Sequence, residues 1–238
     1  MELRFGGRVF RPQVRMLGEL TGVLKEEVHE PDMPVYFMYR DLYLSVRDRE
    51  RAQERGLRYD MTIIPPRSFG EEYVKTLGHY HPHAPGTDLS HPEIYEVLQG
   101  RAHYLLQRRQ DGGITDVVVV EAGEGDKVII PPGYGHVTIN PSLQVLRMAN
   151  WVAGSCESIS GPYKEMRGAA YYELASGWVR NPRYGDLPPL RTVKAKGHRA
   201  LGLAKREEIY GLIRSDPDRL AFLARPQDFG EFFQGLLE

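Results

Sequence analysis

The sequence predicts an all-β domain, built as an antiparallel sandwich or barrel, with an N-terminal arm and a short C-terminal helical extension. Between residues 57 and 152 the chain is a series of short runs rich in apolar, β-branched and aromatic residues. Turn-forming pairs such as Gln99-Gly100 and Asn140-Pro141 separate these runs. A sheet of alternating strands and helices would need helical segments of about 10 to 15 residues between the runs, and we find none.

The chain has 238 residues, so we expect one domain with appendages. Residues 1–33 mix Gly, Arg and Leu without a clear period and are assigned to the arm. Residues 34–180 are assigned to the barrel and residues 181–238 to the C-terminal extension. After residue 204 apolar side chains recur at helical spacing, which predicts two or three short helices that contribute to the core or to a dimer contact.

Within the barrel the strands are predicted in the following order. Residues 34–46 are rich in aromatic and β-branched residues, and the charged run at residues 48–56 is a solvated turn or a short helix. The later strands are expected at residues 57–66, 72–81, 93–98, 101–108, 116–120, 127–130, 136–140 and 144–152, with one more strand pair at 171–180.

The composition excludes several classes of partner. The formal net charge is -1, from 31 basic and 32 acidic residues, so the chain has no excess of positive charge that would attract nucleic acid or anionic lipid. We therefore expect a small-molecule partner. Cys156 is the only cysteine and cannot form an internal disulfide. No apolar stretch approaches the roughly 20 residues that cross a bilayer, and the first residues lack the apolar core of a secretory signal. These features predict a cytoplasmic protein.

Four residues form a candidate metal site. His79 and His81 are two apart, so on a strand both side chains leave the same face. Glu93 opens the next apolar run, and His136 follows the rigid reversal Pro131-Pro132-Gly133-Tyr134-Gly135 at the start of a later strand. Three imidazoles and one carboxylate suit zinc, iron, manganese or nickel, and the coordination positions left over would make the ion a catalyst.

Other histidines fit this site less well. Pro82 interrupts the strand directly after His81, so we expect His83 and His91 in a loop or in a supporting position. His103 lies in the middle of an apolar strand and is interpreted as a packed residue. If Glu93 faces inward it is a buried carboxylate, which is costly unless a cation neutralises it.

These motifs carry a family resemblance. The paired segments GHYH…EIYEVLQG and PPGYGHVTIN resemble the two signatures of the cupin superfamily, whose fold is a double-stranded β-helix or jelly roll. Within that superfamily, TLGHYH, EIY and PPGYGH are similar to the cupin-type glucose-6-phosphate isomerases of archaea and some bacteria. The stretch around Arg15 and the segment DMTIIPP add to the likeness, which covers roughly residues 12–165.

The resemblance implies roles for individual residues. It implies one divalent ion, with iron the first candidate and zinc, manganese or nickel as alternatives. The implied metal ligands are His79, His81, Glu93 and His136. A sugar-phosphate site is implied at Thr62, Thr76, Gly78 and Tyr163, because hydroxyls and an open backbone amide bind phosphate oxygens.

The resemblance also implies a reaction, the interconversion of glucose 6-phosphate and fructose 6-phosphate in glycolysis and gluconeogenesis. In that reaction we expect Glu93 to act as the base and Tyr95 to orient the sugar or relay a proton. The same ligands would serve another metal-dependent cupin, such as a dioxygenase or a different sugar isomerase, or a non-catalytic sugar-binding cupin. Pairing of exposed edge strands predicts a homodimer.

The chain departs from the family pattern at three places. Eleven residues, Pro82 to Pro92, separate the histidine pair from the glutamate, where the family has a short loop. Trp151 stands where the family has a tyrosine near the end of the last barrel strand. The C-terminal extension has no counterpart in the shorter members of the family.

Overall fold

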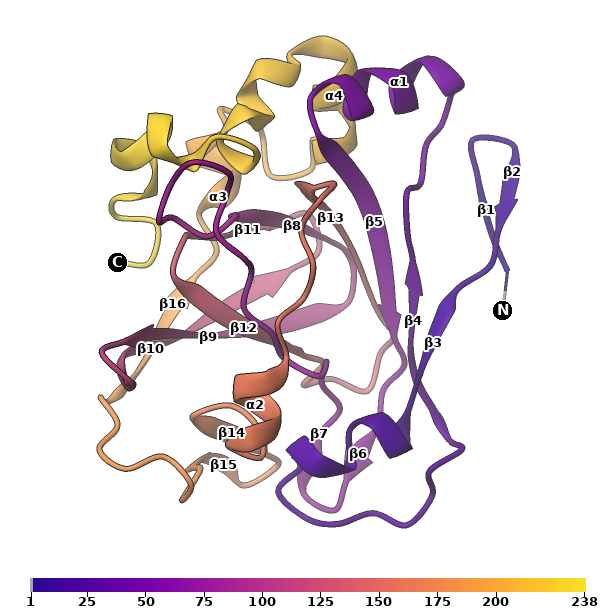
Figure 1. Cartoon of the computed structure of the whole chain (residues 1–238). Coiled ribbons are helices and arrows are strands. Elements are labelled where there is room, and N and C mark those ends of the chain that lie inside the picture. The colour runs from indigo at the N-terminus through magenta and orange to yellow at the C-terminus, as the bar shows by residue number, and fades with distance from the viewer. Residues whose placement is uncertain (1) are drawn as a thin grey trace.

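Two facing β-sheets form the body of the computed structural model, which describes residues 2–238 (Figure 1). The larger sheet has six strands in the order β11 (Lys127–Ile130), β8 (Glu93–Gln99), β13 (Leu146–Ala153), β5 (Leu57–Ile64), β4 (Pro34–Tyr39) and β3 (Gln13–Met16). The second sheet has four strands in the order β12 (Tyr134–Ile139), β9 (Arg101–Gln110), β10 (Gly113–Gly123) and β16 (Leu190–Lys194). Neighbouring strands within both sheets are antiparallel, except that β10 and β16 are parallel.

The path of the chain between these sheets defines the fold. From β8 the chain passes to β9 and β10 in the second sheet, returns to β11 in the first, crosses to β12 and returns to β13. This alternation is a double-stranded β-helix, the jelly roll of the cupins. The all-β prediction is therefore confirmed.

Smaller elements surround the two sheets. A third sheet has the order β15 (Gly177–Arg180), β14 (Tyr171–Leu174), β7 (Glu72–Tyr73) and β6 (Ser68–Phe69), and β1 (Leu3–Phe5) forms a hairpin with β2 (Arg8–Phe10). The α-helices are α1 (Val46–Glu54), α2 (Gly161–Glu165), α3 (Gly197–Ala200) and α4 (Leu212–Ser215). The 3₁₀ segments are Leu17–Glu19, Thr21–Val23, Ile209–Gly211, Pro217–Leu223 and Pro226–Phe233. Over residues 2–238, no helix combines the length and apolarity that a bilayer crossing requires.

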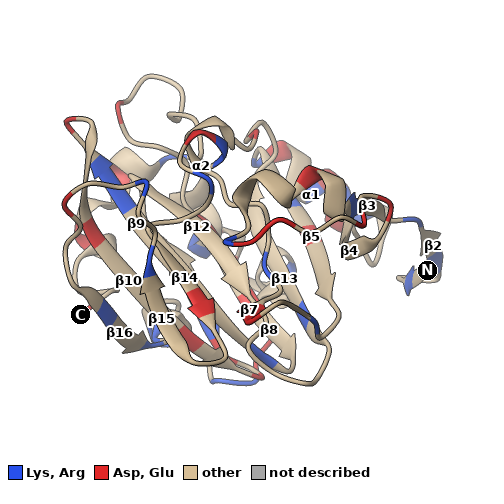
Figure 2. Ribbon diagram, turned by 90° about the horizontal axis from the view of Figure 1, so that it is seen from below, with Lys and Arg blue, Asp and Glu red and all other residues tan. Residues whose placement is uncertain are grey.

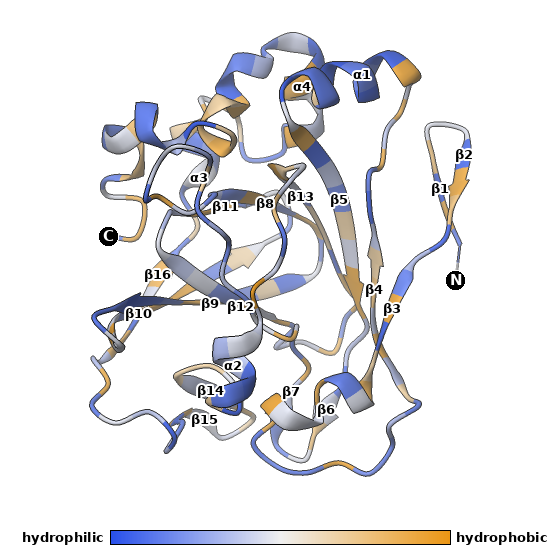
Figure 3. Cartoon of the chain, in the orientation of Figure 1, coloured by the Kyte–Doolittle hydropathy of each residue, from blue (hydrophilic) through white to orange (hydrophobic). Residues whose placement is uncertain are grey.

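Strand β5 shows how the sequence pattern builds the layers. Arg58, Asp60 and Thr62 lie on the inner face of the larger sheet, and the odd-numbered residues between 57 and 63 are buried on its outer face. Hydrophilic and hydrophobic bands follow one another along β5 in Figure 3. The outer face packs against the C-terminal helical segments, whose apolar residues include Ile209, Leu220, Phe222 and Leu223. Both faces of this sheet are therefore covered.

A hydrophobic cluster fills the space between the two sheets. Tyr95 and Val97 of the larger sheet pack together with Tyr104 and Leu106 of β9 and Val118 of β10, and all are at most 6% exposed. Burial of one such aliphatic side chain stabilises a fold by about 1.5–3 kcal/mol. This cluster supports one wall of the cavity described below.

Polar contacts fasten the C-terminal extension to the larger sheet. The indole Nε1 of Trp151 donates to the carbonyl of Ile209 at 3.0 Å, and the amide of Ile209 donates to Glu96 Oε2 at 2.8 Å. Lys127 is fully buried and donates to the carbonyls of Gly125 and Lys205. Trp151 thus faces outward and stabilises the extension. Elsewhere both signs of charge are interspersed over strands and loops (Figure 2).

Two predicted strands are wrong in extent. Residues 72–81 contain only the short strand Glu72–Tyr73, and the rest of the segment joins its neighbours by isolated bridges. Gly78 interrupts the strand because its φ is +80°. The strand predicted at 34–46 ends at Tyr39, and Asp41 has a φ of +55°. The charged run after it is helix α1, capped by Ser45, whose hydroxyl accepts from the amide of Asp48 at 3.2 Å.

Candidate metal centre

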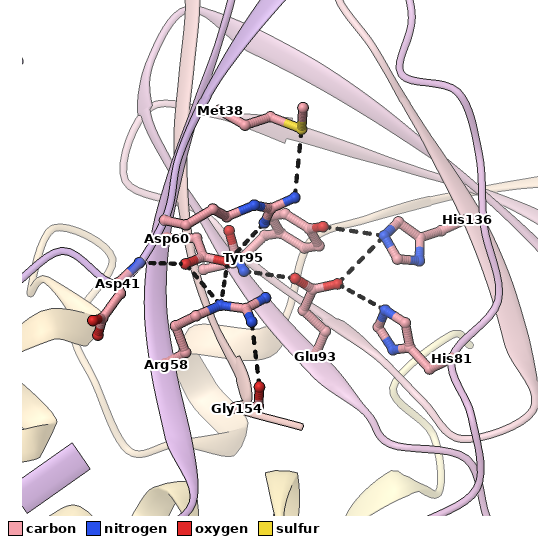
Figure 4. Close-up of polar contacts among 11 residues, drawn as sticks. Met38, Asp41, Arg58, Asp60, His81, Glu93, Tyr95, His136 and Gly154 are labelled. Carbon is pink, nitrogen blue, oxygen red and sulfur yellow. Dashed lines mark hydrogen bonds and ion pairs between the residues drawn. The ribbon is translucent and has the colours of Figure 1, made fainter. Parts of the chain in front are cut away.

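Four side chains from three segments of the chain converge at one end of the barrel. Each of His79, His81, Glu93 and His136 offers one ligand atom, and these four atoms lie within 4.8 Å of one another. Glu93 Oε2 is 3.4 Å from Nε2 of His81 and 3.4 Å from Nε2 of His136 (Figure 4). The structure therefore brings together all four residues that the sequence predicts as metal ligands.

Backbone pairing fixes the position of each ligand. Glu93 is the first residue of β8 and lies between Ile130 of β11 and Val152 of β13. His79 and His136 form a mutual bridge, with amide-to-carbonyl distances of 3.2 and 3.0 Å. The two rings are consequently close, with centroids 4.4 Å apart.

Neighbouring polar groups orient three of the four side chains. The Nδ1 of His81 is 2.8 Å from the carbonyl oxygen of His91, so it acts as donor and leaves Nε2 directed at Glu93. Asn150 Nδ2 donates to Glu93 Oε1 at 2.6 Å, which leaves the other carboxylate oxygen facing the imidazoles. The Tyr95 hydroxyl is 3.1 Å from Nε2 of His136. The contacts of His81 Nδ1 and Glu93 Oε1 are of the kind that supports metal-binding histidines and carboxylates in proteins, whereas Tyr95 contacts the His136 nitrogen that faces Glu93.

The donor set fits a divalent cation. Glu93 Oε2 and His136 Nδ1 are buried and have no hydrogen-bond partner among residues 2–238. A buried carboxylate oxygen without a hydrogen bond is costly, and a cation bound between it and the imidazoles would remove that cost. Three nitrogens and one oxygen are a ligand mixture typical of iron, zinc, manganese or nickel.

The pKa values of the site follow from its burial. Burial, followed by the nearby charge of other histidines, holds the pKa of His79 well below its usual range. Burial likewise lowers the pKa of His136 to about 4, although Glu93 opposes this shift. Both rings are therefore neutral at neutral pH, as a metal ligand must be. Burial also opposes the charged form of His81, but Cys156 and Glu93 outweigh it and raise the pKa to about 10, so a cation would compete with that proton.

A cavity on the inner face of the larger sheet is lined by three of the four ligands, His79, His81 and Glu93. Its wall includes Tyr95 together with Thr62 and Thr76, two of the residues expected to bind phosphate. The Thr76 hydroxyl accepts a hydrogen bond from the amide of Thr138 at 2.9 Å and is fixed by it. The site therefore combines the ligand cluster with hydroxyl groups in one enclosed space.

Two residues predicted to bind phosphate do not line this cavity. Tyr163 is fully buried in a separate cluster on the outer face of the second sheet. Gly78 lies against it, and a Cβ at that position would be 2.6 Å from Cδ1 of Tyr163. The ring of Tyr163 fills the space behind Gly78, away from the cavity, so its contact with the substrate stays a prediction. The glycine serves this close packing.

Several cavity residues were missed by the sequence interpretation. Arg40, Arg58 and Asn150 line the cavity, as do Arg15, Tyr36, Ser158 and Ser160. Strand alternation contained the signal for one of them, because Arg58 and Asp60 share the face of Thr62 on β5. His103 lies elsewhere, with Nδ1 2.7 Å from Glu173 Oε1 and its ring stacked on Trp178.

The fold and the three-histidine, one-glutamate cluster together define a protein of the cupin superfamily. A sequence model described as Glucose-6-phosphate isomerase (GPI) matches residues 14–188. The chain therefore belongs to the glucose-6-phosphate isomerase family, in its cupin-type branch.

Individual relatives agree with this assignment. The glucose-6-phosphate isomerase of Thermococcus litoralis is 29% identical over 136 residues, which are 55% of this chain and 63% of the relative. That of Thermococcus gammatolerans is 32% identical over 132 residues, which are 53% of this chain and 61% of the relative. The match thus spans less than two thirds of either relative. Among solved structures, the 7S globulin of Momordica charantia is similar with a TM-score of 0.38 and 16% identity, covering 62% of this chain and 35% of that one.

Proposed function

We propose that this protein is a metal-dependent aldose-ketose isomerase that interconverts glucose 6-phosphate and fructose 6-phosphate. The observation that carries the proposal is the convergence of His79, His81, Glu93 and His136 on one point beside a cavity, in a member of the glucose-6-phosphate isomerase family. The unpartnered Glu93 Oε2 at that point supports the binding of a cation. Iron is the first candidate for the ion.

The reaction moves hydrogen between carbon 1 and carbon 2 of an open-chain sugar and builds negative charge on the carbonyl oxygen. A bound divalent ion would supply a Lewis acid that stabilises this charge. The chain's own residues would supply orientation and proton transfer. Burial would raise the pKa of Glu93, but the adjacent imidazole of His81, 3.4 Å away, outweighs this effect and lowers the pKa, so the carboxylate is ionised and able to accept a proton.

Tyr95 acts as a hydrogen-bond donor, which complements Glu93 as the proton acceptor. Burial, with the charge of Glu93 next, raises the pKa of Tyr95 well above its usual value, so its hydroxyl stays protonated. This hydroxyl lies at the cavity wall, within 3.1 Å of Nε2 of His136, and can donate to a sugar oxygen. Tyr95 thus orients the substrate next to Glu93.

The experiment that tests the proposal is an assay of fructose 6-phosphate conversion coupled to oxidation of the glucose 6-phosphate formed. The protein is first treated with a chelator, and iron, zinc, manganese and nickel are then added back separately. We expect chelation to abolish turnover and at least one ion to restore it, without consumption of oxygen. Unchanged turnover after complete metal removal contradicts the metal dependence. Oxygen uptake with no isomerisation favours a cupin dioxygenase.

A further inference from the structure

A basic groove lies beside the two large sheets, between the N-terminal segment and the hairpin of β14 and β15. This hairpin and α2 lie together at the lower edge of the molecule in Figure 1. The groove has a volume of about 470 Å³, which is typical of small-molecule sites. It is lined by Leu24, Lys25, Arg167, Tyr172, Val179, Arg180, Asn181, Pro182 and Arg183. We call it the arginine groove, and none of its residues lines the cavity of the metal ligands.

The arginine groove carries positive charge that the protein does not neutralise. Four of its lining residues are cationic and none is acidic. Lys25 forms an ion pair with Glu26, with Nζ 3.2 Å from Oε1. The side chains of Arg167, Arg180 and Arg183 form no hydrogen bond or ion pair with the described part of the chain. Because guanidinium groups are charged at every physiological pH, three unpaired positive charges line one groove and favour an anion there.

Nearby carboxylates do not cancel this charge. Glu72 is buried, and both of its oxygens have partners, Nζ of Lys75 and the amide of Lys25. Glu165 and Asp186 are the acidic residues nearest in sequence to the three arginines, and both line a different hollow. The arginine groove therefore keeps its excess of positive charge.

Two buried side chains hold the arginines in fixed relative positions. The Asn181 side chain donates to the carbonyl of Met166 at 2.8 Å, and its Oδ1 accepts from the amide of Arg183 at 3.0 Å. The Tyr172 hydroxyl donates to the carbonyl of Arg167 at 2.5 Å. The backbones that carry Arg167 and Arg183 are therefore tied to one framework, which reduces the entropy lost when a ligand binds.

Arg167 has a backbone conformation that arginine rarely adopts. Its φ is +53°, just beyond α2, at a position where glycine is the usual residue. The amides of Arg167 and Gly168 donate to the carbonyls of Lys164 and Tyr163, the hydrogen bonds of a glycine-type helix end. The other non-glycine residues with positive φ in the described chain are both aspartates, which tolerate this conformation better. A strained arginine without a polar partner for its side chain points to a role toward a ligand.

The chemistry of the arginine groove indicates the class of ligand. Planar guanidinium groups bind phosphate oxygens through paired N–H donors. Three of them together match a chain of phosphate groups better than a single carboxylate. Leu24 and the 39% exposed Val179 add apolar surface beside these charges, where an organic group attached to the phosphates can pack.

We propose that the arginine groove is a second binding site of this protein and that it binds the polyphosphate chain of a small molecule such as a nucleoside triphosphate. The site is separate from the metal centre, because the groove and the cavity share no lining residue. The proposal therefore does not depend on the isomerase reaction.

The test compares two ligands that share the polyphosphate chain. ATP and inorganic tripolyphosphate are titrated by calorimetry into the metal-loaded wild type, Arg167→Gly, Arg180→Gln and Arg183→Gln. Arg47→Gln is the matched control, at an exposed position of α1 at the opposite end of the molecule (Figure 1). Loss of one charge-assisted contact should weaken binding of both ligands about tenfold in each groove variant. The control should bind both ligands as the wild type does.

Two features of the design isolate the groove. Polyphosphates also bind divalent ions, but any withdrawal of the metal is the same in all variants because the metal ligands are unchanged. Arg167→Gly separates folding from binding, since glycine suits a φ of +53°. Its melting temperature should not fall below that of the wild type, although its affinity for both ligands does.

Each outcome decides for or against the proposal. Equal affinity of the folded groove variants and the wild type overturns it, as does an equal decrease in the control variant. Absence of binding to the wild type at millimolar ligand also overturns it, and an active isomerase with this result leaves the proposed function intact. Tighter binding of ATP than of tripolyphosphate, lost in the groove variants, supports a nucleotide site. Equal binding of the two, lost in the same variants, supports recognition of the polyphosphate chain alone.

Discussion

The Nδ1 of His81 lies 2.8 Å from the backbone carbonyl oxygen of His91, which anchors a candidate metal ligand to the loop that precedes β8. The ring of His91 continues this connection, since its Nδ1 lies 3.1 Å from the carbonyl oxygen of Leu223. A chain of two hydrogen bonds therefore joins the C-terminal extension to the metal ligands. The long loop before β8 and the C-terminal extension therefore meet at His91.

His91→Ala should weaken metal binding. The variant keeps the carbonyl that accepts from His81 but removes the ring that holds this part of the loop against Leu223. Loss of such supporting contacts lowers metal affinity by about 10–100-fold, and we expect a value near the lower limit because the carbonyl remains. Competition with a chromogenic chelator measures the affinity. His103→Ala is the control, and an equal decrease in both variants would refute the connection.

Glu93→Gln and His136→Ala should each remove most of the turnover. Both changes take away a ligand of the cluster, and the first also removes the proposed base. His103→Ala should leave kcat nearly intact, because His103 bonds to Glu173 away from the cavity. Steady-state kinetics with fructose 6-phosphate checks the prediction. A comparable loss in all three variants is inconsistent with the assigned site.

Tyr163→Phe should leave the KM for fructose 6-phosphate unchanged. The Tyr163 hydroxyl is buried and has no partner within residues 2–238, so its removal costs no hydrogen bond. The melting temperature should stay the same or rise, because an unsatisfied polar group is removed from an apolar cluster. A severalfold increase in KM at unchanged stability would restore the original prediction of a substrate contact.

Gly78→Ala should destabilise the protein more than Gly112→Ala does. Both glycines have a φ near +80°, so each substitution carries the left-handed backbone penalty of about 1–2 kcal/mol. Only at Gly78 does the new Cβ meet Tyr163 and Val137 within 2.8 Å, whereas the surroundings of Gly112 are open. Thermal unfolding of the two variants isolates the effect of the contact. Equal decreases in Tm would show that packing behind Gly78 is loose.

Asp48 should make the stability of the protein vary with pH in the acidic range. Hydrogen bonds from Arg214 lower the pKa of Asp48 below its usual value of 3.8, against the effect of burial. A carboxyl group whose pKa is lowered by folding stabilises the protein above its unfolded pKa and loses that effect as the pH falls through its folded pKa. The Tm of Asp48→Asn should therefore be lower than that of the wild type by about 2–4 °C at neutral pH, for a loss of about 1 kcal/mol.

The pH dependence of the Tm of Asp48→Asn tests the predicted direction of this effect. The difference in Tm should be constant above about pH 5 and shrink as the pH falls below 3.8. Asp218→Asn serves as control, because its ion pair with Arg55 is exposed at the surface and contributes little. A difference that grows on acidification would contradict the assignment.

Much of this arrangement follows from local sequence rules, and the remainder depends on tertiary packing. Alternation, turn residues and the spacing of His79, His81, Glu93 and His136 were sufficient to predict the sheets and the ligand cluster. The same rules do not tell which face of a short irregular segment an aromatic ring will cover, so they did not predict that Tyr163 packs behind Gly78. Arg40 was missed because it follows the end of β4, where alternation no longer fixes direction.

The parallel pairing of β10 with β16 has a consequence for folding kinetics. Val117 pairs with Leu190, so this sheet edge forms only when distant parts of the sequence meet. Loop-closure entropy must be lost before such a contact contributes, and chains with many contacts of this kind fold slowly. The last edge of the jelly roll is therefore expected to close late, after the local hairpins that precede it.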